Sequence, residues 1–215
     1  MKLNIIVPDS LNEITLEQYQ KFTKLNTKEN EGSAFLLHKM IEIFCNVNLK
    51  DIATIKYNDV QKLAEHLNKI FDVKSELINT FNLDNIEYGF IPKLDDMTLG
   101  EYIDLDTYLG DWNNIHKAMA VLYRPIKHKK QHRYQIQNYK GTNDKLLKMP
   151  LDIVMGSMVF FYNLNNELLK ITLNFLDNEI PNNLTSHQLE ALERSGVSTN
   201  QFGVLLKGML PSLVQ

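Results

Sequence analysis

The side chains best suited to ligand contact lie in the basic run at residues 127–133, whose sequence is KHKKQHR. Its permanently cationic side chains are Lys127, Lys129, Lys130 and Arg133. Cations at this density suit contacts with DNA phosphates or with an acidic partner surface, or one edge of an oligomer interface. His128 and His132 lie four residues apart, but no Cys, Asp or Glu in the run completes a zinc set. We therefore expect either a solvated loop or an interface here, and no metal site.

A second polar cluster is acidic. Its members are Asp95, Asp96, Glu101, Asp104, Asp106 and Asp111. With Asp104 as the first residue of a calcium loop, Leu109 would stand where the loop needs Gly and Tyr108 where it needs an oxygen ligand. We expect these carboxylates to support a helix start and a solvated surface.

The remaining sequence has no catalytic signature. It contains no Walker loop, dinucleotide-binding fingerprint, G-x-S-x-G elbow or HExxH pair. The one cysteine, Cys45, follows the apolar residues IEIF, which predicts a buried structural thiol and not a nucleophile. We expect a protein that is not an enzyme and that holds no cofactor.

Composition narrows the class of protein further. The 215-residue chain is 44% hydrophobic and 23% charged, which is typical of a soluble globular protein. Its net charge of −3 argues against a general nucleic-acid binder, so any phosphate contact should be confined to the basic run. A single cysteine excludes an internal disulfide and fits a reducing compartment. The apolar segment before Pro8 is too short for a signal peptide, and no apolar run is long enough to cross a bilayer. We expect synthesis in the cytoplasm and no membrane contact.

Two matching signals mark helix starts. Thr98 is followed three residues later by Glu101, the spacing of a capping box, in which each residue satisfies the other's backbone amide. Residues 11–19 align without gaps on residues 94–102, so Thr15 has the same predicted role. The similarity ends after these nine residues, which favours two independent uses of one helix start over a duplication.

Apolar spacing predicts the other elements. The main helices are expected at residues 16–25, 33–46, 59–71, 111–123 and 151–176. Pro125 should end the fourth of these helices. Short strands are expected at residues 2–7 and 134–139, and residues 81–91 should form a small hairpin of two strands with its turn at Asp84-Asn85. The predicted fold is mainly α with a minor β component (α+β), a helical bundle with a small hairpin or sheet. We expect a single domain over residues 1–215, with a subdivision near residues 127–149 as the alternative.

The C-terminal part predicts a second interface. Capping-box spacing recurs at Thr185 and at Ser198, which predicts two short helices. The last helix carries an apolar stripe at i, i+3, i+4 and i+7, made of Phe202, Leu205, Leu206 and Met209. This stripe either closes the core or docks on a neighbouring molecule.

Three phrases resemble those of a known group of proteins. They are LNEITLEQYQKF (residues 11–22), EYGFIPKLDDMTLGEYIDLDTYL (87–109) and HKAMAVLYRPI (116–126). They are similar to phrases in small helical proteins encoded in the virion gene clusters of tailed bacteriophages, including crAss-like phages. With a weaker extension through RYQIQNYKG, the resemblance covers about two thirds of the chain. It implies a structural or assembly role and supplies no functional residues.

Two functions from different classes follow from these observations. The favoured one is a virion structural protein, an oligomeric ring component of the neck or tail in the head-tail connector region. Its partners would be other copies of itself, the portal and neighbouring neck or tail proteins, with DNA phosphate contact through the basic run. The alternative is a tail assembly chaperone, which covers a partner in the host cytoplasm and is absent from the virion.

Overall fold

A computed structural model describes residues 5–131 and 133–179 of the chain. The α-helices in these residues are α1 (Leu16–Thr23), α2 (Ala34–Cys45), α3 (Leu49–Ile52), α4 (Tyr57–Phe71), α5 (Leu99–Leu109), α6 (Ile115–Leu122) and α7 (Leu151–Glu179). The strands are β1 (Thr80–Leu83), β2 (Ile86–Phe90), β3 (Tyr123–Lys130) and β4 (Arg133–Ile136). Three short 3-10 helices are η1 (Leu11–Glu13), η2 (Leu94–Asp96) and η3 (Asp144–Lys148). The predicted α+β fold, mainly helical with a small sheet, is confirmed.

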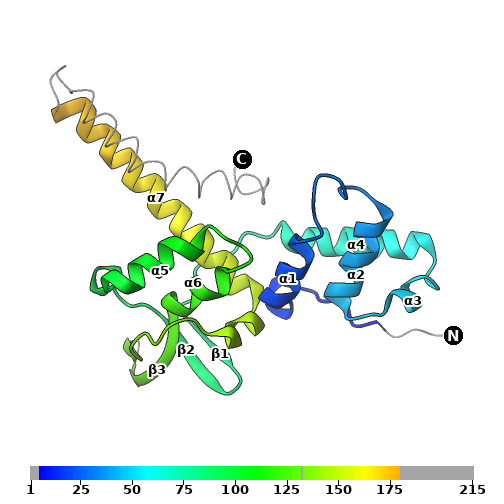
Figure 1. Ribbon diagram of the computed structural model, residues 1–215, viewed down its shortest axis with the longest axis horizontal. Coiled ribbons are helices and arrows are strands. Elements are labelled where there is room, and N and C mark those ends of the chain that lie inside the picture. Colours follow the sequence, from blue (N-terminus) through cyan, green and yellow to red (C-terminus); the bar gives the residue numbers. More distant parts are fainter. Residues whose placement is uncertain (1–4, 132, 180–215) are drawn as a thin grey trace.

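The described elements form two parts that share one core. Helices α2, α3 and α4 lie together near the N-terminus, the sheet lies with α5, α6 and the start of α7, and α1 lies between them (Figure 1). The buried apolar side chains of both parts form one cluster. Gln20 of α1 crosses the junction, because its Nε2 donates to the carbonyl oxygen of Trp112 over 2.8 Å. The domain organisation of the complete chain stays a prediction.

Both predicted capping boxes are present. Thr98 Oγ1 accepts from the amide of Glu101, and Glu101 Oε2 accepts from the amide of Thr98. Thr15 and Gln18 make the same reciprocal pair at the start of α1. A 3-10 helix precedes each box, so the two nine-residue phrases fold alike. Local sequence is therefore enough to define these two helix starts.

The sheet is antiparallel, with the strand order β1-β2-β3-β4. Asp84 and Asn85 have φ angles of +50° and +63°, the left-handed pair that a two-residue hairpin requires, which confirms the predicted turn between β1 and β2. One face of the sheet packs on α7. There Tyr123 Oη donates to the carbonyl oxygen of Ile78 over 2.8 Å and lies 3.0 Å from Ser157 Oγ.

Helix α7 follows the predicted range closely and is buried at its start. Residues 151–158 are buried on all sides, except for the half-buried Asp152. At Gly156 the segment before β1 crosses the helix so closely that an added Cβ would lie 2.1 Å from the carbonyl oxygen of Glu76. Beyond this crossing the helix extends away from the sheet (Figure 1). At 1.5 Å per residue its 29 residues span about 43 Å.

In the described residues one predicted element is wrong, and another is present with different ends. Residues 5–7 have no strand partner and are irregular, and residues 1–4 lie outside the described residues. The helix expected at residues 111–123 begins only at Ile115 and ends at Leu122, because Tyr123 starts β3. Pro125 therefore lies inside a strand, next to a β-bulge where its missing amide is tolerated.

Candidate interface at the basic hairpin

The basic run is a β-hairpin and not a loop. Tyr123 and Arg124 are buried, Pro125 and Ile126 are half-buried, and residues 127–130 are exposed, so β3 leaves the core where the cations begin. Lysine and histidine do not favour strands, but pairing with β4 and packing against the sheet outweigh that weak preference. Strand β4 covers only the first half of the range 134–139 and adds Arg133.

A bulge and a turn set the direction of the cations. The pairing of β3 with β4 shifts between Ile126 and His128, so that Lys127 has no partner in the register. Such bulges bend a strand and redirect its side chains. Gln131, with a φ of +54°, makes the turn to β4. His132 lies outside the described residues.

Packing on the second face of the sheet holds the hairpin in place. The ring of Tyr134 lies across Gly89, where an added Cβ would be 2.5 Å from it. Tyr134 Oη donates to the carbonyl oxygen of Phe90 over 2.8 Å, and burial raises the pKa of this phenol, so it stays a donor. Lys129 forms an ion pair with Glu87 of β2. The hairpin is thus anchored to the sheet through both of its strands.

A buried ion pair lies at the base of the hairpin. Arg124 Nη1 donates to Glu101 Oε1 over 2.6 Å, and both side chains are almost fully buried. Arg124 Nε is buried and has no hydrogen-bond partner among the described residues. The negative charge of the Glu101 carboxylate is therefore the main interaction that offsets the cost of burying the Arg124 guanidinium. Tyr139, after β4, donates to Asp104 Oδ2 over 2.8 Å, and burial together with this carboxylate raises the pKa of its hydroxyl. Helix α5 is therefore fixed against this face of the sheet.

The exposed part of the hairpin is cationic. Lys127, Lys130 and Arg133 are exposed and form no ion pair with the described residues. Below them a groove of about 960 Å³ runs between the hairpin, the end of β2 and α7. Its lining is apolar in part, with Phe90 and Phe160, whose rings meet edge to face at 5.6 Å, and it also includes the acidic Asp95. The exposed cations of the hairpin, beside a groove that is apolar only in part, suit an acidic partner surface that also carries apolar groups.

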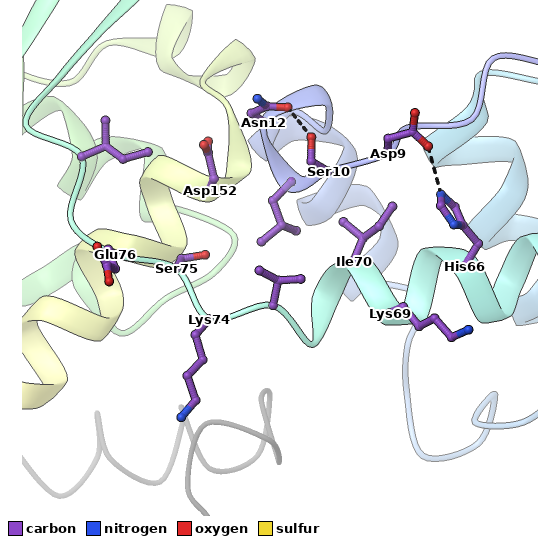
Figure 2. A pocket seen from close by; sticks show the side chains of 13 residues that line it. Asp9, Ser10, Asn12, His66, Lys69, Ile70, Lys74, Ser75, Glu76 and Asp152 are labelled. Atoms are coloured by element: carbon purple, nitrogen blue, oxygen red, sulfur yellow. Dashed lines mark hydrogen bonds and ion pairs between the residues drawn. The ribbon is translucent and has the colours of Figure 1, made fainter.

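A second cavity of about 450 Å³ lies where the end of α4 and η1 meet the start of α7 (Figure 2). His66 Nε2 lies 3.1 Å from the carbonyl oxygen of Pro8 and 3.4 Å from Asp9 Oδ1. The charged residues around it have both signs, namely the acidic Asp9, Glu76 and Asp152 and the basic Lys69 and Lys74. Mixed charge of this kind indicates no single class of ligand.

The structure also bears on the predictions for Cys45, for metal binding and for membrane contact. Cys45 is buried as expected, and burial raises its pKa to about 11, far from that of a nucleophile at neutral pH. In residues 5–131 and 133–179 no three His, Cys, Asp or Glu side chains gather as a metal site would need. No helix in that part of the chain is long and apolar enough to cross a membrane. The predicted stripe of Phe202, Leu205, Leu206 and Met209 lies outside the described residues.

Two features of the site were not predicted from the sequence. The ion pair joins residues 23 apart, and no local pattern indicates it. The contact between Tyr134 and Gly89 has one local signal, since an isolated glycine inside a strand often marks a close approach.

Comparisons of the chain with protein-family models, with curated proteins and with solved structures found no match.

Proposed function

We propose that this protein is a structural subunit of a tailed-phage particle, a ring component of the neck or tail that is present in many copies. Its role is to bind other proteins of the particle, and not to catalyse a reaction. The phage-like phrases described above support the class of protein. The geometry of the basic hairpin supports the mode of action.

The single observation that carries this proposal is the anchored, cationic hairpin. Its outer half is exposed, whereas Tyr134 on Gly89 and the pair of Arg124 with Glu101 fix its base. A surface that is ordered before binding loses little conformational entropy when a partner arrives. The hairpin therefore suits repeated docking on acidic protein surfaces. Contact with the phosphates of DNA passing through the neck would use the same cations.

The long helix α7 adds support for an assembled subunit. Its second half extends beyond the sheet, α5 and α6, while its first half is held by the core (Figure 1). A ring needs each subunit to offer two different surfaces, one to each neighbour. The hairpin and the extended part of α7 are different elements of the part of the molecule that holds the sheet. They are suitable candidates for two such surfaces.

Quantitative mass spectrometry of purified particles of the phage tests the proposal. We expect the protein in mature particles at many copies, in a constant ratio to the portal protein. Electron microscopy of the same particles should then locate it in the neck or tail. If the protein is absent from mature particles but bound to unassembled tail proteins in infected cells, it is a tail assembly chaperone instead.

A further inference from the structure

A buried histidine lies where helix α1 meets helix α6. His116, in the first turn of α6, is 7% exposed. Its Nδ1 lies 3.4 Å from Nε2 of Gln20 on α1. Its Nε2 lies 3.5 Å from Oδ1 of Asp144 in η3. Each ring nitrogen therefore has a polar neighbour from a different element.

The orientation of the Gln20 amide determines where the proton of His116 lies. Gln20 Nε2 donates to the carbonyl oxygen of Trp112 over 2.8 Å and lies 3.3 Å from that of Asn113. Turning the amide round would place its oxygen against these two acceptors. An amide nitrogen only donates, so His116 Nδ1 has to accept and carries no proton. The ring is then neutral, with its proton on Nε2 toward Asp144.

A second proton on this ring would bring two N–H groups face to face. A histidine cation donates from both of its nitrogens, so Nδ1–H would point at the N–H of Gln20. We propose that His116 is a pH-sensitive switch, whose neutral ring holds the end of α1 on α6 and whose protonation releases Gln20 and opens this contact. The inference concerns the chain alone and does not depend on the proposed function.

The environment of His116 sets the direction of the pH dependence. Burial lowers the pKa of His116, and the Lys117 cation acts in the same direction. Asp144 and Asp111 oppose this shift, but the Asp144 carboxylate is 83% exposed and is screened by water. The group that faces the ring from α1, Gln20, is uncharged. The open state therefore binds the proton more tightly than the closed state does. The closed contact is stable above the ordinary histidine pKa of about 6.5 and is lost as the pH falls through the lower folded value.

Trp112 provides a natural probe of this contact. It is the one tryptophan of the chain, it is 3% exposed, and its ring meets that of Tyr19 on α1 at 5.0 Å. When the pH of the full-length protein falls from about 7 to about 5, across the ordinary pKa of histidine, Trp112 emission should shift to longer wavelength. Quenching of this emission by acrylamide should increase over the same interval. A wild-type protein that shows neither change would overturn the proposal.

Two histidine variants assign the response to its residue. His116→Asn keeps an acceptor for Gln20 but cannot gain a proton in this pH range, so its Trp112 emission should stay nearly constant. His66→Asn is the matched control, because His66 Nε2 lies 3.1 Å from the carbonyl oxygen of Pro8, which also accepts from a protonated ring. It should respond as wild type does. Equal responses of His116→Asn and wild type would refute the switch.

Nuclear magnetic resonance of the wild-type protein tests the geometry without a substitution. The imidazole nitrogen shifts of His116 should show the Nε2–H form at neutral pH, and a proton on Nδ1 instead would contradict the role of Gln20. Gln20→Met removes the opposing N–H group, so His116 should titrate at higher pH in this variant than in wild type. An unchanged titration midpoint would mean that the protonation of His116 does not involve Gln20, and the proposal would fail.

Discussion

Arg124 and Glu101 connect strand β3 to the start of helix α5 through one carboxylate. Glu101 Oε1 accepts from Arg124 Nη1 over 2.6 Å, while Glu101 Oε2 accepts from the Thr98 amide over 2.7 Å. The capping box that starts α5 is therefore also the anchor of the basic hairpin. A change at Glu101 should act on both elements.

We expect Glu101→Gln to lower the free energy of unfolding by about 3 to 5 kcal/mol, because it leaves the Arg124 cation buried without its counter-charge. Urea denaturation followed by circular dichroism measures this. The control is Glu17→Gln, which removes an exposed i,i+4 pair with Lys21 and should cost less than about 1 kcal/mol. Similar losses of stability in the two variants would mean that the buried ion pair of Glu101 with Arg124 contributes no more to stability than the exposed pair of Glu17 with Lys21.

Thr98→Ala should lower stability by about 1 kcal/mol with the fold retained, because it removes the acceptor for the Glu101 amide. Thr107→Ala on the same helix is the control. Thr107 is exposed, and within the described residues its hydroxyl donates to the carbonyl oxygen of Ile103 alone, so its loss should change stability by less than about 0.5 kcal/mol. An unchanged denaturation midpoint for Thr98→Ala would contradict the role of the cap.

Alanine at two helical glycines should change stability in opposite directions. Gly100→Ala adds a methyl group in open space and should stabilise α5 by up to about 1 kcal/mol, because alanine favours helices. Gly156→Ala places the same methyl group 2.1 Å from the backbone oxygen of Glu76. Separating α7 from this segment should cost about 1 to 3 kcal/mol or more. The melting temperatures of both variants test this prediction. A higher melting temperature for Gly156→Ala than for wild type would contradict the close crossing of α7 by the segment before β1.

These substitutions also show where prediction from sequence succeeds. The capping boxes at Thr15 and Thr98 and the turn at Asp84-Asn85 depend on contacts within a few residues, so the sequence predicts them correctly. The start of α7 at Leu151 is also predicted correctly, because apolar residues cover most of the helix surface in its first turns.

The errors arise where distant contacts decide the structure. Strand β3 lacks an alternating pattern and forms because β2, over 30 residues earlier, offers it a paired edge. The basic run was therefore correctly marked as an exposed cationic surface, although its hairpin geometry was missed. The exposed apolar side chains of α5 were also missed, because helical spacing alone does not tell which side of a helix packs on the core.

Stability should fall at alkaline pH partly because of Cys45. Burial raises its pKa from about 9 to about 11, so between these values the unfolded chain has lost a proton that the folded chain keeps. Stability then decreases as pH rises, by up to about 2 to 3 kcal/mol over the interval. Cys45→Ala should reduce the slope of stability against pH between 9 and 11, in urea titrations compared with wild type. Stability curves with the same slope between pH 9 and 11 for Cys45→Ala and wild type would contradict a contribution from the Cys45 thiol.

The basic hairpin should matter for binding and not for folding. Changing Lys127, Lys129, Lys130 and Arg133 together to Ser should leave the melting temperature nearly unchanged, because these side chains are exposed and form one surface ion pair. Binding to other proteins of the particle should weaken, most at low salt, where exposed charges are least screened. If DNA is a ligand, each lost phosphate contact should reduce the salt slope of duplex binding by about 0.9.

A charge-matched control separates local contacts from net charge. Changing Lys50, Lys62, Lys69 and Lys74 to Ser removes four exposed cations from α3, α4 and the segment after α4. Both variants differ from wild type by the same four charges, so an effect of net charge alone would be equal in the two. We expect reduced binding only when the hairpin is changed. Equal binding by the hairpin variant and wild type at every salt concentration would reduce the hairpin to a solvated surface, and the proposed interface would then have to lie elsewhere on the chain.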